Sequence, residues 1–341
     1  MFSTGQLSNI TNTLSQSDLI VITTHRNPDA DAMGSSLGLK HLLSKKISAE
    51  IVVLVPDRFP AFLNWMPDAG QTKVFDQDRE NAKALLSRAN VIFCLDYNHP
   101  SRTSSMEEEL RKASGLKIMI DHHQEPDDFA AYRWSDTKAS STCELIVSFM
   151  DALGWQASLD KDIATCLYTG IMTDTGSFRF SATSPLTHRT IARLMETGIQ
   201  QWKIHEAIFN QNTYQKLKLW GYAFLHKLEV LPEYNTAFIA LNAEELSHYQ
   251  HEEGDLEGLV NYALSIKGMT MGALFSERDD KIRISFRSVG KFSVNSFARK
   301  HFNGGGHENA AGGTSTISLE ETIQKFRNSL VEYREALNAN D

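Results

Sequence analysis

Short runs of apolar, mostly β-branched residues alternate with segments of helical periodicity through the first half of the chain. The apolar runs predict buried strands, which lie at residues 20–24, 50–55, 90–96 and 116–120. Amphipathic segments predict helices at residues 6–17, 34–46, 81–88, 107–114, 140–153, 160–172 and 186–198. Strands that alternate with helices in this way are typical of a doubly wound, mostly parallel sheet.

The pattern changes after residue 200. Residues 201–228 are helical in character and rich in aromatic and basic residues, which predicts a helical connector. Beyond it, strands are predicted at residues 236–241, 269–277 and 281–288, the last two joined by a short polar turn, and helices at residues 292–302 and 319–337. We therefore predict two α/β domains, residues 1–200 and a smaller one at residues 229–341, with the active site in the cleft between them.

The composition fits a globular protein of the reducing cytoplasm. The chain has 341 residues, of which 41% are hydrophobic, enough for two ordinary cores. We expect no membrane span, because no apolar run is long enough, and no secretion signal, because the N-terminus lacks the basic and apolar regions of one. Cys94, Cys143 and Cys166 lie far apart in apolar segments, with neither a disulfide framework nor a zinc-binding spacing.

The net charge of −8 limits the nucleic-acid partners of the chain. Proteins that bind long nucleic acids neutralise many phosphates and usually carry a basic surface for that purpose. This chain has no stretch rich in lysine or arginine beyond Lys45 and Lys46. We therefore expect that it binds no long nucleic acid, and that any nucleic-acid substrate is short.

Side chains able to bind a metal follow three of the predicted strands. His25, Asp29 and Asp31 come after the first strand, Asp96 ends the third, and Asp121–His123 follow the fourth. The carboxyl ends of parallel strands meet at one edge of a sheet, where ligands bind, so we expect these groups to converge. Imidazole and carboxylate together suit a divalent ion such as manganese.

The segment after the first strand also resembles two commoner structures. Residues 29–34 begin like a calcium-binding loop, but the twelfth position is Lys40 rather than the bidentate glutamate that such a loop requires. Proline, aspartate and glycine also form ordinary turns, and a simple turn stays open as an alternative to a metal site.

Asp174 lies just beyond the predicted helix at residues 160–172. A carboxylate at this end of a helix is unfavourable, because the C-terminus already carries partial negative charge. A bound cation nearby would explain the aspartate, and so would a simple turn before Gly176.

Five glycines surround His307 between residues 304 and 313. Backbone N–H groups in such a loop can form a nest for an anion, and glycine lets the backbone approach a phosphate closely. A flexible linker is the alternative, although linkers rarely hold histidine, glutamate and asparagine between glycines. We favour a substrate-binding loop. Arg287, near the end of a predicted strand, would add a bidentate phosphate contact if it lies close to that loop, and is otherwise a surface residue.

Taken together, these motifs resemble the DHH/DHHA1 phosphoesterase family. The name-giving triplet is Asp121–His123, the first motif runs from His25 to Ser35, the second contains Asp96, the fourth is Thr173–Gly176, and Gly304–Gly313 resembles the C-terminal DHHA1 signature. The resemblance covers nearly the whole chain. In size and domain plan it is greatest with the short bacterial nanoRNase/pAp-phosphatase group.

The resemblance implies two divalent metal ions, with manganese favoured. His25, Asp29 and Asp96 would hold one ion. The second would be held by Asp31, Asp96, His122 and Asp174, so that Asp96 bridges. Asp121 would orient a ligand imidazole, and His123 and Arg102 would contact the scissile phosphate. The distal part of the nucleotide would contact the second domain, through Arg287, Gly304, Gly305, Gly306 and His307.

The implied function is hydrolysis of very short RNA oligonucleotides to mononucleotides and of 3′-phosphoadenosine 5′-phosphate to AMP, by a hydroxide that two metal ions activate. Cleavage of cyclic or linear dinucleotides is an alternative. An inorganic pyrophosphatase is a weaker one, because the glycine signature argues against it. A non-catalytic, metal-dependent nucleotide-binding module is an alternative of another class, against which the intact ligand set argues. The sequence leaves the physiological metal, the cleavage direction and the oligomeric state open, with a homodimer among the options.

Overall fold

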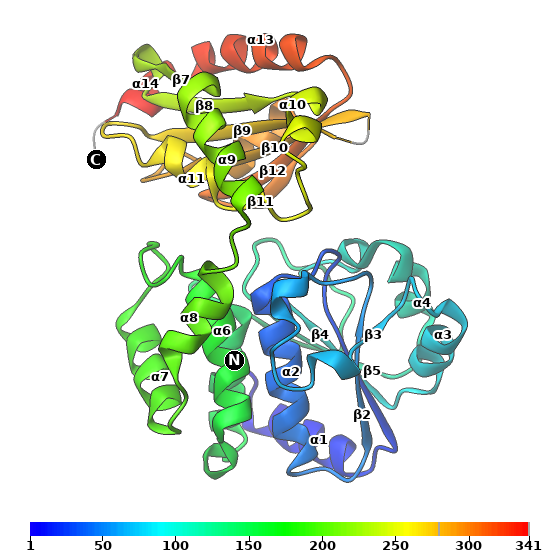
Figure 1. The fold of residues 1–341 in the computed structure, drawn as a ribbon. Coiled ribbons are helices and arrows are strands. Elements are labelled where there is room, and N and C mark those ends of the chain that lie inside the picture. The colour runs from blue at the N-terminus through cyan, green and yellow to red at the C-terminus, as the bar shows by residue number, and fades with distance from the viewer. Residues whose placement is uncertain (279, 340–341) are drawn as a thin grey trace. The chain divides into compact units, whose positions relative to one another are not determined.

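The computed structural model of the chain describes residues 1–278 and 280–339. Residues 279, 340 and 341, which fall in the predicted polar turn and at the end of the predicted second domain, lie outside the described residues. The chain divides into two compact units, Met1–Gln211 and Asn212–Asp341, which are described one at a time below (Figure 1). The fold class predicted from the sequence, two α/β domains of which the first has a parallel sheet, is confirmed.

The first unit is built on a six-stranded sheet in the order β3-β2-β1-β4-β5-β6, in which every pairing is parallel. Its strands are β1 Leu19–Thr23, β2 Glu50–Val55, β3 Lys73–Val74, β4 Val91–Leu95, β5 Leu116–Asp121 and β6 Tyr132–Ser135. The sequence analysis missed β3 and β6. Both are short edge strands without the continuous apolar run of a central strand, so the pattern gives no signal for them.

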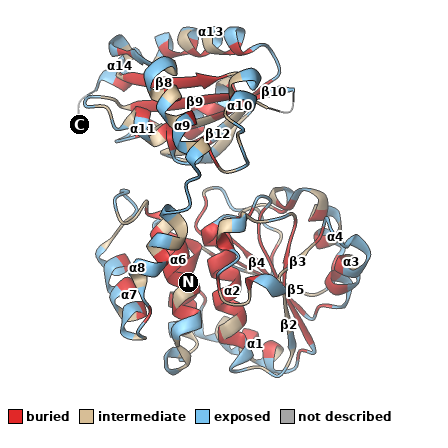
Figure 2. Ribbon diagram, viewed as in Figure 1, coloured by how far each residue is buried: buried red, intermediate tan, exposed pale blue. Residues whose placement is uncertain are grey.

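Helices cover both faces of this sheet. They are α1 Thr4–Ser15, α2 Ala30–Ser44, α3 Arg79–Arg88, α4 Glu107–Lys112, α5 Thr142–Ala152, α6 Lys161–Asp174, α7 Pro185–Glu196 and α8 Gln201–Phe209, with short 3₁₀ turns at Ala61–Leu63, Ala69–Gln71, Pro100–Met106 and Gln156–Ser158. Successive strand residues enter two different cores. Ile22 packs into the core that includes α2, α5 and α6, whereas Val21 packs into the core that includes α3 and α4. Burial on both faces explains why every residue of β1 and β4 except Thr23 is apolar (Figure 2).

The second unit has a mixed six-stranded sheet in the order β11-β12-β10-β9-β8-β7, in which only the β8–β9 pairing is parallel among the described pairings. The strands are β7 Leu228–Leu231, β8 Thr236–Leu241, β9 Met271–Arg278, β10 Lys281–Ser288, β11 Gly305–His307 and β12 Ala310–Ser315. The helices are α9 Tyr214–Tyr222, α10 Ala243–His248, α11 Leu259–Leu264, α12 Val294–His301, α13 Leu319–Leu330 and α14 Arg334–Asn338, with short turns at Ala223–Lys227, Pro232–Tyr234 and Val331–Tyr333.

Two cores hold this second sheet. A phenylalanine-rich core joins one face to α12 and α13, and Phe286 lies at its centre, with ring centroids 5.5 Å from Phe297 and 6.2 Å from Phe326. On the other face, Leu219 of α9 packs with Ile239 of β8 in a smaller core.

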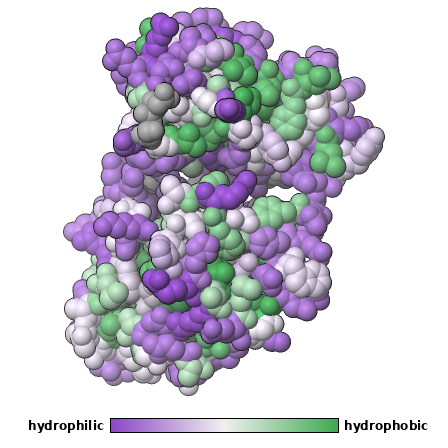
Figure 3. Space-filling model, turned by 90° about the vertical axis from the view of Figure 1, so that its left-hand side faces the viewer, coloured by the Kyte–Doolittle hydropathy of each residue, from purple (hydrophilic) through white to green (hydrophobic). Residues whose placement is uncertain are grey.

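Hydrophilic and hydrophobic residues are interspersed over the face of the molecule seen in Figure 3. Among the described helices, none is both long and apolar enough to cross a membrane.

Two sequence-based expectations for the second half need correction. The segment at residues 201–228 is not one continuous helix, because α8 ends at Phe209 and α9 begins at Tyr214, where the Thr213 hydroxyl accepts a hydrogen bond from Lys216 N (3.0 Å) and caps the new helix. The glycine segment is not an open loop either. It forms a hairpin of β11 and β12 at the edge of the sheet, a pairing that glycine-rich sequence does not favour and that tertiary contacts supply.

Candidate metal centre

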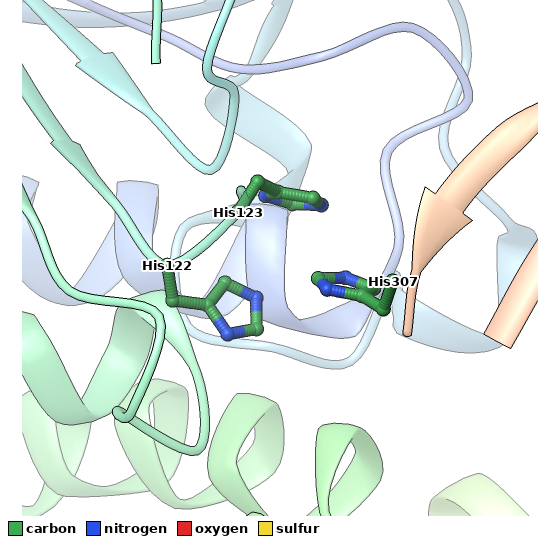
Figure 4. Close-up of side chains that lie close together, drawn as sticks. All are labelled: His122, His123 and His307. Atoms are coloured by element: carbon green, nitrogen blue, oxygen red, sulfur yellow. The ribbon is translucent and has the colours of Figure 1, made fainter. Parts of the chain in front are cut away.

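The candidate site lies where the strand order of the first sheet reverses, between β1 and β4. This is the point at which helices leave opposite faces and a crevice opens beyond the carboxyl ends of the strands. His25 follows β1, Asp96 follows β4, and His122 and His123 follow β5, whose end is seen in Figure 4. All four side chains are buried. The expected convergence of these strand ends therefore occurs in the structure.

Asp96 occupies a strained backbone position at the centre of this group. Its φ of +63° lies in the left-handed region, which aspartate tolerates better than most residues. Residues with such strained backbone conformations cluster at functional sites. The turn brings its carboxylate between two imidazoles. Oδ2 lies 3.3 Å from His25 Nε2, and Oδ1 lies 3.6 Å from His122 Nε2. One carboxylate thus faces two separate sets of potential metal ligands.

The first set consists of His25, Asp29 and Asp96. His25 Nδ1 lies 2.7 Å from the carbonyl oxygen of Arg26, to which it donates, so Nε2 is directed toward the carboxylates. Asp29 caps α2 through Oδ1, which accepts hydrogen bonds from the backbone of Asp31 and Ala32 (both 3.0 Å). The helix therefore starts at residue 30 rather than at the predicted residue 34, and Asp29 Oδ2 lies 3.9 Å from His25 Nε2.

The second set consists of Asp31, Asp96 and His122, with Asp174 beside it. His122 Nε2 lies 3.4 Å from Asp174 Oδ2 and 3.9 Å from Asp31 Oδ2. Asp174 is the last residue of α6, and its place next to an imidazole offsets the unfavourable helix end. The structure thus brings together all six residues that the sequence analysis names as metal ligands.

Asp121 has a different partner from the one expected. Its Oδ1 lies 2.7 Å from His123 Nδ1, and its Oδ2 accepts a hydrogen bond from the backbone of His123 (3.1 Å). Residues two apart on an extended chain point to the same side, so Asp121 faces His123 and not the intervening His122. The ring of His122 instead directs Nδ1 toward the carbonyl oxygen of Ala139 (3.4 Å).

Arg102 lies in the 3₁₀ segment that follows Asp96. Its carbonyl oxygen accepts a hydrogen bond from the backbone of Arg26 (2.7 Å), which ties this segment to the loop after β1. Its positive charge is near enough to His25 to oppose protonation of that imidazole. The structure therefore places Arg102 near His25 of the first ligand set.

The carboxylates of this group repel one another, and the pKa values of Asp31 and Asp174 show it. Burial, together with the charges of Asp96 and Asp174, raises the pKa of Asp31 well above its usual range. Burial also raises the pKa of Asp174 to about 7, although the neighbouring imidazole of His122 opposes the shift. Burial acts in the same direction on Asp96, but the hydrogen bond from His25 and the charges of the surrounding imidazoles hold its pKa well below the usual range.

The imidazoles show the opposite response. Burial alone lowers the pKa of His25, but the hydrogen bond to Asp96 and the charge of Asp29 raise it to about 9. Burial is likewise outweighed at His122, whose pKa the aspartates around it raise to about 9. Four aspartates therefore share a small volume in which protons on the imidazoles supply the positive charge. Oxygen and imidazole nitrogen donors in this arrangement fit divalent cations of the manganese type.

Metal binding to this centre is expected to release protons and to strengthen as the pH rises. With pKa values of about 9, His25 and His122 are both protonated at neutral pH, and a metal ion has to displace those protons. The affinity for Mn²⁺ should therefore increase from about pH 6 to pH 8, by up to about tenfold per pH unit for each proton displaced. Calorimetric titration in two buffers of different ionisation enthalpy counts the protons released.

The matched control is the variant His25→Gln, which removes one of the two titrating imidazoles. It should release about one proton fewer on binding Mn²⁺ than the wild-type protein does. An affinity independent of pH, or equal proton release by the two proteins, would contradict the expectation.

In the second unit, Arg287 and His307 lie on one face of the sheet. Each pairs with Ala310 of β12, which lies between them, so they occupy neighbouring strands to either side, about 10 Å apart. The next row on the same face is Gly305, Gly312 and Ser285. Basic side chains therefore flank a floor of small residues.

Packing accounts for some of the glycines in this hairpin. A Cβ on Gly304 would lie 2.0 Å from the carbonyl oxygen of Gly312. A Cβ on Gly306, whose φ is +149°, would lie 2.5 Å from the carbonyl oxygen of Ala310. At Gly305 and Gly312 nothing approaches an added Cβ closer than 3.7 Å. The packing of the hairpin thus requires glycine at residues 304 and 306, but not at residues 305 and 312.

Residues that sequence reasoning missed come from the start of α5. The Ser/Thr-rich segment before this helix indicates only a cap. In the structure the backbone N–H groups of Thr142 and Cys143 donate to Asp31, and the Thr142 hydroxyl donates to Asp96. No spacing in the sequence connects residues 142 and 96, so only the folded chain shows this contact.

Comparison with known proteins shows two family domains. Residues 19–171 match the DHH family, N-terminal domain, and residues 235–334 match the DHHA1 domain. The bifunctional oligoribonuclease and PAP phosphatase NrnA of Thermus thermophilus is 30% identical over 317 residues, which cover 92% of this chain and 89% of that protein. The protein of the same name from Bacillus subtilis is 31% identical over 318 residues, covering 91% and 93%.

Among solved structures, an exopolyphosphatase-related protein from Bacteroides fragilis has a similar fold. It superposes with a TM-score of 0.95 and 38% sequence identity, over 99% of this chain and 98% of that one. The similarity thus extends over both units.

Proposed function

Because this chain belongs to the DHH/DHHA1 family of phosphoesterases, we propose that it hydrolyses very short RNA oligonucleotides to mononucleotides and 3′-phosphoadenosine 5′-phosphate to AMP. Membership of the family and the named relatives make the chain a phosphoester hydrolase. The observation that carries the choice of chemistry is the group of four aspartates and two histidines at the strand-order reversal of the first unit, of which His25, Asp31, Asp96 and His122 are buried. It offers two sets of ligands that share one carboxylate.

The proposed ligands follow the two sets described above. His25, Asp29 and Asp96 hold one divalent cation, and the other is held by Asp31, Asp96, His122 and Asp174. Four carboxylates nearly balance the charge of two divalent ions, of which manganese is favoured by the donor types. When bound, such a pair supplies a nucleophile at neutral pH by lowering the pKa of water, and stabilises charge on the phosphate oxygens.

His123 and Arg102 contact the scissile phosphate in this proposal. Asp121 binds His123 Nδ1, which fixes the orientation of the ring that contacts the phosphate in this proposal. The guanidinium of Arg102 supplies two parallel donors to the same phosphate. No serine or cysteine nucleophile is needed, and the thiol of Cys94 is unsuited to one because burial raises its pKa to about 11.

The second unit contributes recognition of the part of the nucleotide remote from the reacting phosphate. Arg287, His307 and the glycines Gly304, Gly305 and Gly306 are the proposed contacts. Support comes from the face that Arg287 and His307 share, where the small side chains between them let a ligand lie close to the strand backbone. The net charge of −8 favours a short substrate over a long one.

The test is a time course with Mn²⁺ on a diribonucleotide, 3′-phosphoadenosine 5′-phosphate, a cyclic dinucleotide and a long single-stranded RNA. Rapid hydrolysis of the first two and slow hydrolysis of the last is expected. Preference for the cyclic dinucleotide or for the long strand would replace the proposed substrate. If none of the four substrates is hydrolysed, the proposal as a whole is contradicted.

Substitution of Gly312 tests the role of the sheet face separately from its folding. The Gly312→Ala variant should fold normally, because only the carbonyl oxygen of Ile284 lies within 4 Å of the added Cβ, at 3.8 Å. A methyl group on a ligand-binding floor should nevertheless raise KM, by about tenfold, the scale on which a pocket detects one extra carbon. Steady-state kinetics on the diribonucleotide and thermal melting measure the two effects.

Two glycine variants of the same unit serve as comparisons. Gly306→Ala should lower the melting temperature, since its Cβ would overlap the carbonyl oxygen of Ala310 at a left-handed backbone position. Nothing lies within 4 Å of a carbon added to Gly221 in α9, so Gly221→Ala should not lower the melting temperature and should leave KM unchanged. An unchanged KM in Gly312→Ala would remove this face from the substrate site.

A further inference from the structure

The first turn of α5 holds ligand carboxylates from two other elements. Ser141 caps the helix by accepting a hydrogen bond from Glu144 N (3.1 Å). The N–H groups of Thr142 and Cys143 are therefore left to bind elsewhere, as the first donors of any helix are. They donate to Asp31 Oδ2 (2.7 Å) and Oδ1 (2.9 Å), one to each oxygen.

The side chain of Thr142 adds a contact to the shared carboxylate. Its hydroxyl donates to Asp96 Oδ1 at 2.9 Å, and the threonine is fully buried. Asp96 Oδ2 faces His25, so the hydroxyl fixes the rotation of the carboxylate with one oxygen toward each ligand set. A buried hydrogen bond to a charged group is stronger than a neutral one, so it restricts the carboxylate effectively.

The residues just before the helix support a third ligand. The carbonyl oxygen of Ala139 faces His122 Nδ1 at 3.4 Å. The next residue, Ser140, is fixed by two hydrogen bonds to Glu144 Oε2, from its backbone (2.8 Å) and its hydroxyl (2.7 Å). The segment 139–144 thus contacts candidate ligands from α2, from the turn after β4 and from the end of β5.

We propose that Thr142 is the positioning residue of the metal centre, whose hydroxyl holds Asp96 in the orientation that serves both ligand sets while its backbone N–H holds Asp31. The inference rests on the proposed function for the identity of the ligands. It assigns to Thr142 no contact with substrate or metal. Partners that orient metal ligands typically change metal affinity by about 10- to 100-fold when they are removed.

The test compares Thr142→Val, which keeps the shape and loses the hydroxyl, with Thr142→Ser, which keeps the hydroxyl. Mn²⁺ affinity is measured by calorimetry on the full chain without substrate. Thr142→Val should bind Mn²⁺ about 10- to 100-fold more weakly than the wild type, and Thr142→Ser within about threefold of it. Activity of Thr142→Val should also need a higher Mn²⁺ concentration and recover toward the wild-type kcat when Mn²⁺ is raised.

Thr169→Val is the matched control. Thr169 is also fully buried, but its hydroxyl donates only along α6, to the carbonyl oxygen of Thr165 (2.7 Å). Its replacement should leave Mn²⁺ affinity unchanged, which separates a specific effect at Asp96 from the loss of any buried hydroxyl.

The outcomes distinguish this proposal from the proposed function. Equal Mn²⁺ affinity of folded Thr142→Val and the wild type overturns the role of Thr142 alone. A tenfold loss in Thr142→Ser also overturns it, because the hydroxyl would then not be the group that matters, and this result holds even if Thr142→Val does not fold. The expected pattern of affinities without hydrolysis of either substrate would support Thr142 and contradict the proposed function. Absence of Mn²⁺ binding by the wild type would overturn both.

Discussion

Replacing Asp96 by asparagine is expected to lower kcat by at least about 10³-fold. Asp96 is shared by both ligand sets, with Oδ2 3.3 Å from His25 and Oδ1 3.6 Å from His122. An amide keeps the volume but loses the negative charge and one acceptor oxygen, so both sets are weakened at once. A loss of 10³-fold corresponds to about 4 kcal/mol of transition-state stabilisation, which is within the several kcal/mol that metal centres supply.

The comparison variant is Asp76→Asn, which alters an exposed aspartate paired with Arg79 on the surface of the same unit. Exposed ion pairs contribute little, so its kcat and melting temperature should stay close to the wild-type values. Kinetics on the diribonucleotide and Mn²⁺ titration of both variants complete the measurement. Retention of more than about a tenth of wild-type kcat by Asp96→Asn would exclude Asp96 as a shared ligand.

Replacing Gly170 by alanine is expected to destabilise the first unit and to weaken metal binding, although alanine is the better helix former. A Cβ on Gly170 of α6 would lie 2.3 Å from Cys143 Sγ and 2.8 Å from Asp31 Oδ1, closer than atoms can pack. Either α6 moves away from α2 or the Asp31 carboxylate is displaced. Overpacking of this kind costs about 1–3 kcal/mol, whereas helix propensity alone would favour alanine by about 1 kcal/mol. A fall in the free energy of unfolding therefore indicates overpacking, and a rise indicates that only helix propensity has changed.

Gly5→Ala in α1 provides the opposite expectation within the same unit. Nothing lies within 4 Å of its added Cβ, so this variant should be as stable as the wild type or slightly more stable. Urea denaturation of both variants, with Mn²⁺ titration of the folded proteins, distinguishes the two cases. A Gly170→Ala variant that matched Gly5→Ala in stability and bound Mn²⁺ normally would show that the packing between α2, α5 and α6 is looser than the structure indicates.

The residues of the candidate metal centre could be expected from the sequence to converge, because their chemistry and their strand positions coincide. Asp96 follows a strand that is apolar at every position, and His122 follows another, so both are placed at the same sheet edge by the parallel topology alone. Asp174 could be suspected because a carboxylate at a helix end needs a nearby positive charge.

The pairings among those residues could not be predicted in the same way. Asp121 binds His123 because alternate residues of an extended chain lie on the same side. Which histidine it binds therefore depends on where β5 ends. The short edge strand β6 and the β11–β12 hairpin lack a local signal, since edge strands need no continuous apolar run and glycine disfavours strands. Their formation depends on neighbouring strands that are already in place.

Local patterns along the chain were therefore sufficient for the α/β plan and for the side chains expected to converge at one edge of the first sheet. Apolar periodicity and the residue types at strand ends are local properties, so they are visible before the chain folds. The contacts by which Thr142 and Cys143 hold Asp31 and Asp96, and the need for a glycine at position 170, follow only from the packed structure. Those contacts join α5 and α6 to residues far away in sequence, and they exist only once the helices pack on one face of the sheet.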